Sequence, residues 1–191
     1  MSHNEKILSI FRDTNALLEG HFVLSSGRHT SSYFQCAKVL QYPEYLTAFS
    51  IMIADEFEKY KPDVVISPAI GGIVLGTEVG TQIGSRTIFA ERKKGKMVLR
   101  RGFSISPGEK VLIVEDVITT GKSSIECSKL VEDAKGKTIG YGCIIDRSNG
   151  KSNIKQKIVS QIELNIPSYS KENIPDNLSK IEAVKPGSRK L

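Results

Sequence analysis

Hydrophobic and polar positions in the first third of the chain predict two helices and two short strands. Apolar residues in the segment 7–18 recur at steps of three and four, which predicts an amphipathic helix that ends near Gly20. The β-like segments 21–24 and 33–36 flank a polar stretch. A second helix is predicted over 43–60, because a proline suits the first helical turn.

From residue 63 onward, short aliphatic runs alternate with helical patterns. The predicted strands are 64–66, 87–90, 110–115, 138–145 and 157–164, and helices are predicted up to Gly84 and over 122–134. Strands that alternate with helices at this spacing indicate βαβ units with buried parallel strands. The fold class is therefore α/β, with a mainly parallel central sheet flanked by helices.

Glycine recurs at every fourth residue in the first of these two helices, at Gly72, Gly76, Gly80 and Gly84. On a helix these positions form one smooth stripe, which lets a backbone approach closely. Polar side chains between them exclude a membrane span. We therefore expect the stripe to pack tightly on the sheet or against a partner subunit.

Composition limits the class of protein. The chain has 191 residues, about one domain's worth, and its 39% hydrophobic and 25% charged residues are typical of a soluble globular protein. The net charge of +6 suggests an acidic partner without distinguishing nucleic acid from a phosphorylated metabolite. No segment is apolar for long enough to span a membrane or to act as a signal peptide.

The cysteines are few and far apart. Cys36, Cys127 and Cys143 form no C-x-x-C pair, which argues against a disulfide framework and a structural zinc site. A reducing cytoplasm is the expected compartment.

The segment 111–124 carries the strongest chemical signal. An aliphatic strand ends in Glu115 and Asp116, a turn rich in threonine and glycine follows, and then a helix begins. A helix N-terminus at the end of a strand suits a phosphate, whereas adjacent acids suit sugar hydroxyls or a cationic or metal-bound centre. A helix cap without a ligand is the alternative. A nucleotide P-loop is rejected, because Asp116 stands where that motif needs glycine.

Three other segments could hold anions. Residues 91–101 contain six basic side chains and one acid, which predicts a charged loop that stays mobile until an anion arrives, or simply a solvated loop. The turn 67–72 after a strand offers backbone N–H groups for a diphosphate. Arg147 at a strand end favours a surface ion pair when taken alone, although an arginine there can also grip a planar carboxylate.

The segment 111–124 resembles the phosphoribosyl-diphosphate (PRPP) signature of type I phosphoribosyltransferases. Segments 20–35, 67–72, 91–96, 146–147 and 185–189 are similar to the orotate branch of that family, so the resemblance touches nearly the whole chain. It implies a type I phosphoribosyltransferase fold in one domain, 1–191. The implied core is about 41–149, with a small hood from about 1–40 and 150–191.

The resemblance also implies an activity. The enzyme would transfer the 5-phosphoribosyl group of PRPP to orotate, giving orotidine 5′-monophosphate and pyrophosphate in pyrimidine synthesis. Mg²⁺ would be carried mainly by PRPP, with no metal ligand assigned to the protein. A homodimer is implied, with a lid loop 91–102 acting on the neighbouring subunit and with no nucleic acid or membrane as partner.

Site residues follow by resemblance. Those implied for PRPP binding are Ala69, Ile70, Gly71, Arg92, Lys93, Lys96, Glu115, Asp116, Val117, Ile118, Thr119, Thr120, Gly121, Lys122 and Ser123. Those implied for catalysis are Lys93, Lys96, Glu115 and Asp116, and those for orotate binding are Tyr33, Phe34, Thr119 and Arg147, with Arg28 and His29 as weaker candidates. The chain departs from relatives that have lysine at Ser25 and Gly71 and histidine at Val98.

Three rival functions remain open from the sequence. A transferase for a purine base would have little use for an arginine that clamps a carboxylate. A PRPP-sensing regulator would bind PRPP without forming product. A basic nucleic-acid binder, whose affinity would fall steeply with salt, leaves the Glu115–Asp116 pair unexplained.

Overall fold

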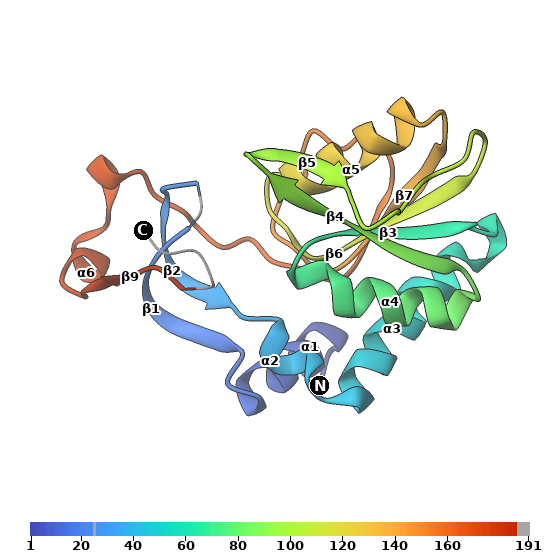
Figure 1. The fold of residues 1–191 in the computed structure, drawn as a ribbon. Helices are drawn as coiled ribbons and strands as arrows, with labels where there is room; N and C mark the ends of the chain where they lie inside the picture. The colour runs from blue at the N-terminus through green and yellow to red at the C-terminus, as the bar shows by residue number, and fades with distance from the viewer. Residues whose placement is uncertain (25, 187–191) are drawn as a thin grey trace. The chain divides into compact units, whose positions relative to one another are not determined.

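The computed structural model describes residues 1–24 and 26–186, and the chain divides into two compact units. The smaller unit combines Met1–Val39 with the segment that starts at Asn165, and the larger unit is Leu40–Leu164. The chain therefore begins in the smaller unit, forms the larger one and returns, as the colour sequence in Figure 1 shows.

The larger unit is built on a six-stranded sheet in the order β5-β4-β3-β6-β7-β8. Its strands are β3 (Val64–Pro68), β4 (Arg86–Lys93), β5 (Lys96–Leu99), β6 (Lys110–Ile118), β7 (Lys137–Asp146) and β8 (Ile158–Glu163). All neighbouring strands are parallel except β4 and β5, which form an antiparallel pair. This confirms the expected α/β class with a mainly parallel sheet. Strand β8 lies in the larger unit, which reaches Leu164. The sequence analysis instead assigned the chain from about residue 150 onward to the hood.

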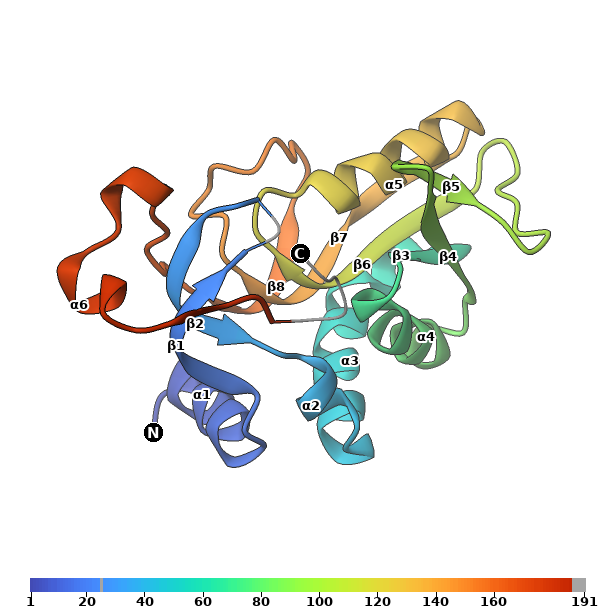
Figure 2. The ribbon, with the colours of Figure 1, turned by 60° about the vertical axis from the view of Figure 1, so that its left-hand side comes forward.

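Helices cover both faces of this sheet. Figure 1 and Figure 2 show α3 (Pro43–Phe57) and α4 (Gly71–Ile83) on one face and α5 (Lys122–Asp133) on the other. The predicted helices of this unit are confirmed, with α3 passing into the 3₁₀ turn η1 (Glu58–Tyr60). The short helix α2 (Ala37–Leu40) precedes α3 in the chain.

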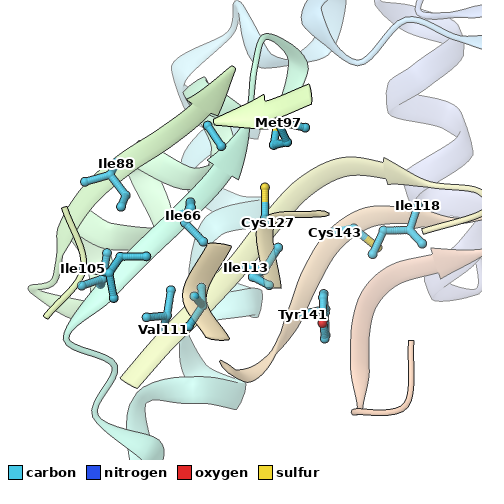
Figure 3. Packing of buried hydrophobic residues seen from close by; sticks show 13 residues of the cluster. Ile66, Ile88, Met97, Ile105, Val111, Ile113, Ile118, Cys127, Tyr141 and Cys143 are labelled. Atoms are coloured by element: carbon cyan, nitrogen blue, oxygen red, sulfur yellow. The ribbon is translucent and has the colours of Figure 1, made fainter. Parts of the chain in front are cut away.

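The core under α5 holds the strand ends that carry the candidate site. Figure 3 shows buried side chains of the sheet, among them Ile66, Ile113 and Tyr141, gathered around Cys127 of this helix. Burial of such side chains is the main favourable term in folding, at about 25 cal/mol for each Å² of apolar surface. The position of α5 is therefore fixed by packing along its length.

The glycine stripe packs α4 against the sheet. A β-carbon at Gly76 would overlap the Ser67 hydroxyl of β3, and one at Gly80 would overlap the Thr87 methyl of β4. Gly72 lies over the Val114 carbonyl in the same way, so close packing on the sheet is confirmed for these three positions. Gly84 instead ends the helix with a left-handed φ of 77°.

The smaller unit contains a three-stranded sheet in the order β2-β1-β9. Its elements are α1 (His3–Asp13), β1 (Leu17–Val23), β2 (His29–Phe34), η2 (Lys171–Asn173), α6 (Asp176–Ser179) and β9 (Ala183–Val184). Strand β1 is antiparallel to β2 and parallel to β9.

The prediction that the first helix runs to Gly20 is wrong. Helix α1 ends at Asp13, where the Thr14 hydroxyl donates to the Ile10 carbonyl at 2.7 Å and Asn15 takes a left-handed φ of 51°. Leu17 and Leu18 continue the helical spacing, but they pair with β2 because the chain has already turned.

Candidate active site

The two adjacent acids of β6 point to opposite faces of the sheet. The Ser124 hydroxyl, from the first turn of α5, donates a hydrogen bond to Glu115 Oε2. A β-carbon at Gly71, the first residue of α4, would meet the Asp116 carboxyl carbon at 2.8 Å. Successive side chains of a strand alternate between faces, and here each acid reaches the N-terminal turn of a different helix. The positive end of a helix favours a carboxylate there.

Burial dominates the electrostatics of both acids. It raises the pKa of Glu115 from its ordinary 4.5 to about 8, against a lowering effect of the Ser124 hydrogen bond. The Asp116 carboxylate raises that pKa further, and the Arg92 guanidinium lowers it. Burial also raises the pKa of Asp116, although the Val117 amide donates to its carboxylate at 3.0 Å. Perturbed carboxyl groups at strand ends are typical of functional sites.

The turn after β6 opens the helix α5. Thr119 and Thr120 are exposed, and Gly121 takes a left-handed φ of 73° as the residue that precedes the helix. The Lys122 amide donates to the Thr120 hydroxyl at 3.3 Å. The first N–H groups of an α-helix have no partner within the helix, so this turn presents donors to an anion.

A second turn of the same kind follows the neighbouring strand β3. Ala69 and Ile70 are joined by a cis peptide bond, and Gly71 begins α4. The Ala69 amide donates to the Ala90 carbonyl of β4 at 2.7 Å, and the Ile70 side chain is exposed. Because β3 and β6 are parallel neighbours, their following turns lie at the same edge of the sheet, where open α/β sheets bind ligands.

Arg147 lies beside the turn that follows β6. Its amide, just after β7, donates to the Ile118 carbonyl at 2.8 Å, so Arg147 and Thr119 come from neighbouring strand ends. The Asp146 carboxylate accepts a hydrogen bond from the Ser148 amide at 2.7 Å. This carboxylate is therefore bonded to the backbone of the turn that follows β7. The two residues predicted to bind the base from this unit are therefore brought together.

The prediction that 91–101 is a loop is wrong for most of its length. Residues 91–99, here called the basic hairpin, form the end of β4, a two-residue turn and β5. The turn residues Lys94 and Gly95 have positive φ values of 50° and 81°, as tight hairpin turns require.

Ion pairs explain why this run of positive charge folds. The Glu91 carboxylate lies 3.5 Å from Arg100 and 3.3 Å from Arg101, and Arg92 pairs with Glu126 of α5. Repulsion within the run is thus offset by acids on two elements, one of them distant in sequence.

The positively charged side chains of the basic hairpin lie on two different faces. Lys93 lies directly opposite Lys96, and both side chains are exposed on one face. Arg92 lies opposite the buried Met97 and therefore faces α5, where it meets Glu126. Val98 is half-buried at the position where some relatives have histidine.

The candidate residues of the smaller unit have partners within that unit. Phe34 is buried edge-on against Phe11, with ring centroids 5.3 Å apart, and Tyr33 lies 6.0 Å from the Phe22 ring. Arg28 Nε donates to the Ser168 hydroxyl at 2.8 Å. His29 Nδ1 lies 2.7 Å from His21 Nε2. The candidate positions Ser25 and 187–189 lie outside the described residues.

Glu126 of α5 was missed as a site residue, and Ser124 was expected only as the last residue of the signature 111–124, without its contact to Glu115. Ser124 is fully buried, on the same helix face as Cys127 and Val131. A serine on an apolar helix face is a signal that sequence reasoning can use, because a buried hydroxyl needs a partner. Glu126 gives no such signal, since its partner Arg92 lies 34 residues away.

Within residues 1–24 and 26–186, no group of three or more His, Cys, Asp or Glu side chains is placed to hold a metal ion. No helix in this described part is long and apolar enough to cross a membrane.

Comparisons with known proteins relate the chain to one family. A family described as the phosphoribosyl transferase domain matches residues 37–174. The orotate phosphoribosyltransferase of Chlorobium phaeobacteroides is 54% identical over 183 residues, 96% of this chain and 95% of that protein. That of Caldanaerobacter subterraneus is 52% identical over 187 residues, 98% of each chain.

Solved structures show the same fold at low identity. The orotate phosphoribosyltransferase from Aeropyrum pernix has a TM-score of 0.71 and 20% identity, covering 83% of this chain and 93% of that chain. The adenine phosphoribosyltransferase from Rhodothermus marinus has a TM-score of 0.65 and 21% identity, covering 84% and 100%. The fold is therefore common to enzymes named for different bases.

Proposed function

Because the chain belongs to the orotate phosphoribosyltransferase family, we propose that it transfers the 5-phosphoribosyl group of PRPP to orotate. The products are orotidine 5′-monophosphate and pyrophosphate, in pyrimidine synthesis. The observation that carries this proposal is identity of 54% along nearly the whole length of a relative with that name. The resemblance found in the sequence is confirmed by the same comparison.

The strand ends of the larger unit suit PRPP. In this proposal the turn Thr119, Thr120, Gly121, Lys122 and Ser123 holds the 5′-phosphate at the N-terminus of α5. Val117 and Ile118 place that turn, and backbone groups of Ala69, Ile70 and Gly71 hold the diphosphate at the N-terminus of α4.

The acids act on the ribose. Bond breaking at the anomeric carbon leaves positive charge on the sugar, and Glu115 and Asp116 stabilise it while accepting hydrogen bonds from ribose hydroxyls. Burial raises the pKa of both acids by destabilising the charged carboxylate. Such a carboxylate is therefore strongly stabilised when cationic charge develops beside it. Support comes from their places at two helix N-termini around the end of one strand.

The basic hairpin supplies positive charge to the leaving pyrophosphate. Lys93 and Lys96 share one exposed face, so they can act on one anion together, with Arg92 held from the other face by Glu126. We propose that the lid, residues 91–102, closes over the active site of a neighbouring subunit in a homodimer.

Mg²⁺ fits this site as an ion carried by the substrate. The described chain offers no cluster of three ligating side chains, whereas Mg²⁺ is often held mainly by substrate phosphates. When bound, the ion neutralises charge on the diphosphate. The protein residues then hold the ribose and the 5′-phosphate.

The base is proposed to lie at the ends of β6 and β7. Arg147 can bind the orotate carboxylate in bidentate fashion, and Thr119 beside it offers a hydroxyl to the ring. Tyr33 is proposed to stack on the ring. Phe34 is proposed to contribute backbone groups, since its own ring packs on Phe11.

A parallel assay tests the choice of base. Pyrophosphate release is measured with PRPP, Mg²⁺ and, separately, orotate, adenine, hypoxanthine and uracil. Release with orotate alone supports the proposal, and release with a purine alone refutes it. Because an adenine phosphoribosyltransferase shares the fold, the fold alone does not identify the base that this chain uses. The assay identifies that base directly.

A mixing experiment tests the shared lid. Lys93→Ala and Asp116→Asn proteins, each with low activity, are combined under conditions that exchange subunits. Regained activity supports a lid that acts on its neighbour, and a simple average of the two activities contradicts it.

The proposed compartment is the cytoplasm, supported by three buried cysteines of which none is in a disulfide.

A further inference from the structure

Ser124 is a fully buried hydroxyl on the first turn of α5. Its side chain donates a hydrogen bond to Glu115 Oε2 across the gap between α5 and β6. We propose that Ser124 is a positioning residue that holds Glu115 in the orientation needed to receive the ribose of PRPP. This inference rests on the proposed function.

The contact is specific in its geometry. A serine inside a helix usually bonds to the carbonyl one turn earlier or faces solvent. Ser124 has no solvent to face, and it bonds instead to the acid of the neighbouring strand. A glutamate side chain has three rotatable bonds, so without a fixed donor its carboxylate can take several orientations.

The hydrogen bond assigns different tasks to the two oxygens of Glu115. Oε2 is held by Ser124, and Oε1 then serves as the acceptor for a ribose hydroxyl. A hydroxyl donor also favours the charged form of the carboxyl group, which is the form that stabilises a cationic sugar. The same contact therefore fixes the orientation of Glu115 and partly offsets the effect of burial on its pKa.

Several charged or titratable groups on β6 and on the elements around it interact electrostatically with Glu115. They are Asp116 on β6, Arg92 on β4, Glu126 and Cys127 on α5, and Cys143 on β7. Among them Arg92 alone lowers the pKa of Glu115, and it is already paired with Glu126. The Ser124 hydrogen bond lowers the pKa of Glu115 more than Arg92 does, so it contributes more to stabilising the carboxylate form.

The first test compares three variants under the orotate assay. Ser124→Ala is expected to lower kcat about tenfold at neutral pH with little change in the KM for orotate. It should also move the acidic limb of the pH profile upward by about one unit, because the carboxylate loses a donor that lowers its pKa. Ser124→Thr keeps the hydroxyl and should restore most of both.

Ser128→Ala is the matched control. Ser128 is also buried on α5, one turn later, but its hydroxyl bonds to Thr138 at 3.0 Å and not to an acid. It should leave the pH profile in place. A Ser124→Ala profile that coincides with the wild type overturns the inference, as does an equal shift in Ser128→Ala.

A double-mutant cycle separates action through Glu115 from a general loss of packing. If Ser124 acts through Glu115, Ser124→Ala should lower kcat little further in a Glu115→Gln background. Full additivity of the two losses overturns the inference even if Ser124→Ala is less stable. Absence of any product from the wild type with orotate refutes the proposed function itself, whereas wild-type turnover with additive variants refutes only the role of Ser124.

Discussion

Glu115→Gln should stabilise the protein without ligand at neutral and alkaline pH while it lowers activity. The folded protein raises the pKa of Glu115 from 4.5 to about 8, so the native state resists loss of the proton more than the unfolded chain does. The stability tied to this group is fully present below about pH 4.5 and is lost as pH rises through about 8. Gln keeps the shape and an oxygen for Ser124, but it never carries the charge.

The size of the effect follows from the shift. The difference of 8 − 4.5 units, at about 1.36 kcal/mol per unit, gives about 5 kcal/mol of lost stability well above pH 8. At pH 7 the unfolded chain is fully ionised and the native group still mostly protonated, so about 3 kcal/mol is lost. The variant should therefore gain up to about this amount over the wild type between pH 4.5 and 7.

Urea unfolding of both proteins from pH 4.5 to 9, without PRPP, measures the effect directly. Glu132→Gln is the control, because Glu132 is an exposed glutamate on α5 and its removal should leave the pH dependence of the wild type. Curves for Glu115→Gln and wild type that stay parallel across this range would refute the claim that burial penalises the Glu115 carboxylate.

Four further variants test other parts of the site. Lys93→Ala or Lys96→Ala should lower kcat by tenfold or more, about 1.4 kcal/mol, with a smaller effect on orotate binding. The reason is that the hairpin acts on the negative charge that develops on the leaving pyrophosphate in the transition state. Equal losses of kcat and of orotate affinity in steady-state kinetics would contradict this. Arg147→Ala should raise the KM for orotate at least about tenfold, and an unchanged KM moves the base site elsewhere. Gly71→Ala places a β-carbon against the Asp116 carboxylate and should weaken PRPP binding in calorimetry, whereas wild-type affinity would show that Asp116 moves freely.

The sheet and its helices could be predicted because local pattern and tertiary packing agree. The aliphatic runs before Ser67 and Glu115 are buried strands, and the stripe of Gly72, Gly76 and Gly80 faces the sheet as its spacing indicates. The turn after β6 was also predicted in place, with Gly121 at a left-handed φ. In each case the residues that give the signal are neighbours in sequence.

Where the sequence misled, distant contacts decided the structure. Leu17 and Leu18 fit a helical pattern, but pairing with β2 places them in a strand. The basic hairpin has the composition of a loop, and its Arg92 pairs with Glu126, which is far along the chain. Periodicity and composition do not report such partners.

The sequence predicted the strand that carries the two acids, but it did not predict which helix each acid contacts. Glu115 and Asp116 were predicted to end a strand at residue 115, whereas β6 continues to Ile118 and the two acids lie within its last four residues. Strand alternation sends them to different helices, so each has its own environment. The buried Ser124 hydroxyl became visible as a partner only when α5 was placed over β6.

Titration calorimetry with PRPP in the presence of Mg²⁺ tests the central claim most directly, since the account stands on a PRPP site at the ends of β3 and β6. The wild type should release or absorb heat in a saturable, one-site titration. Thr120→Ala combined with Asp116→Asn should abolish that signal in a protein that still unfolds cooperatively. A wild type that shows no binding, or a double variant that binds as tightly as the wild type, would contradict the account.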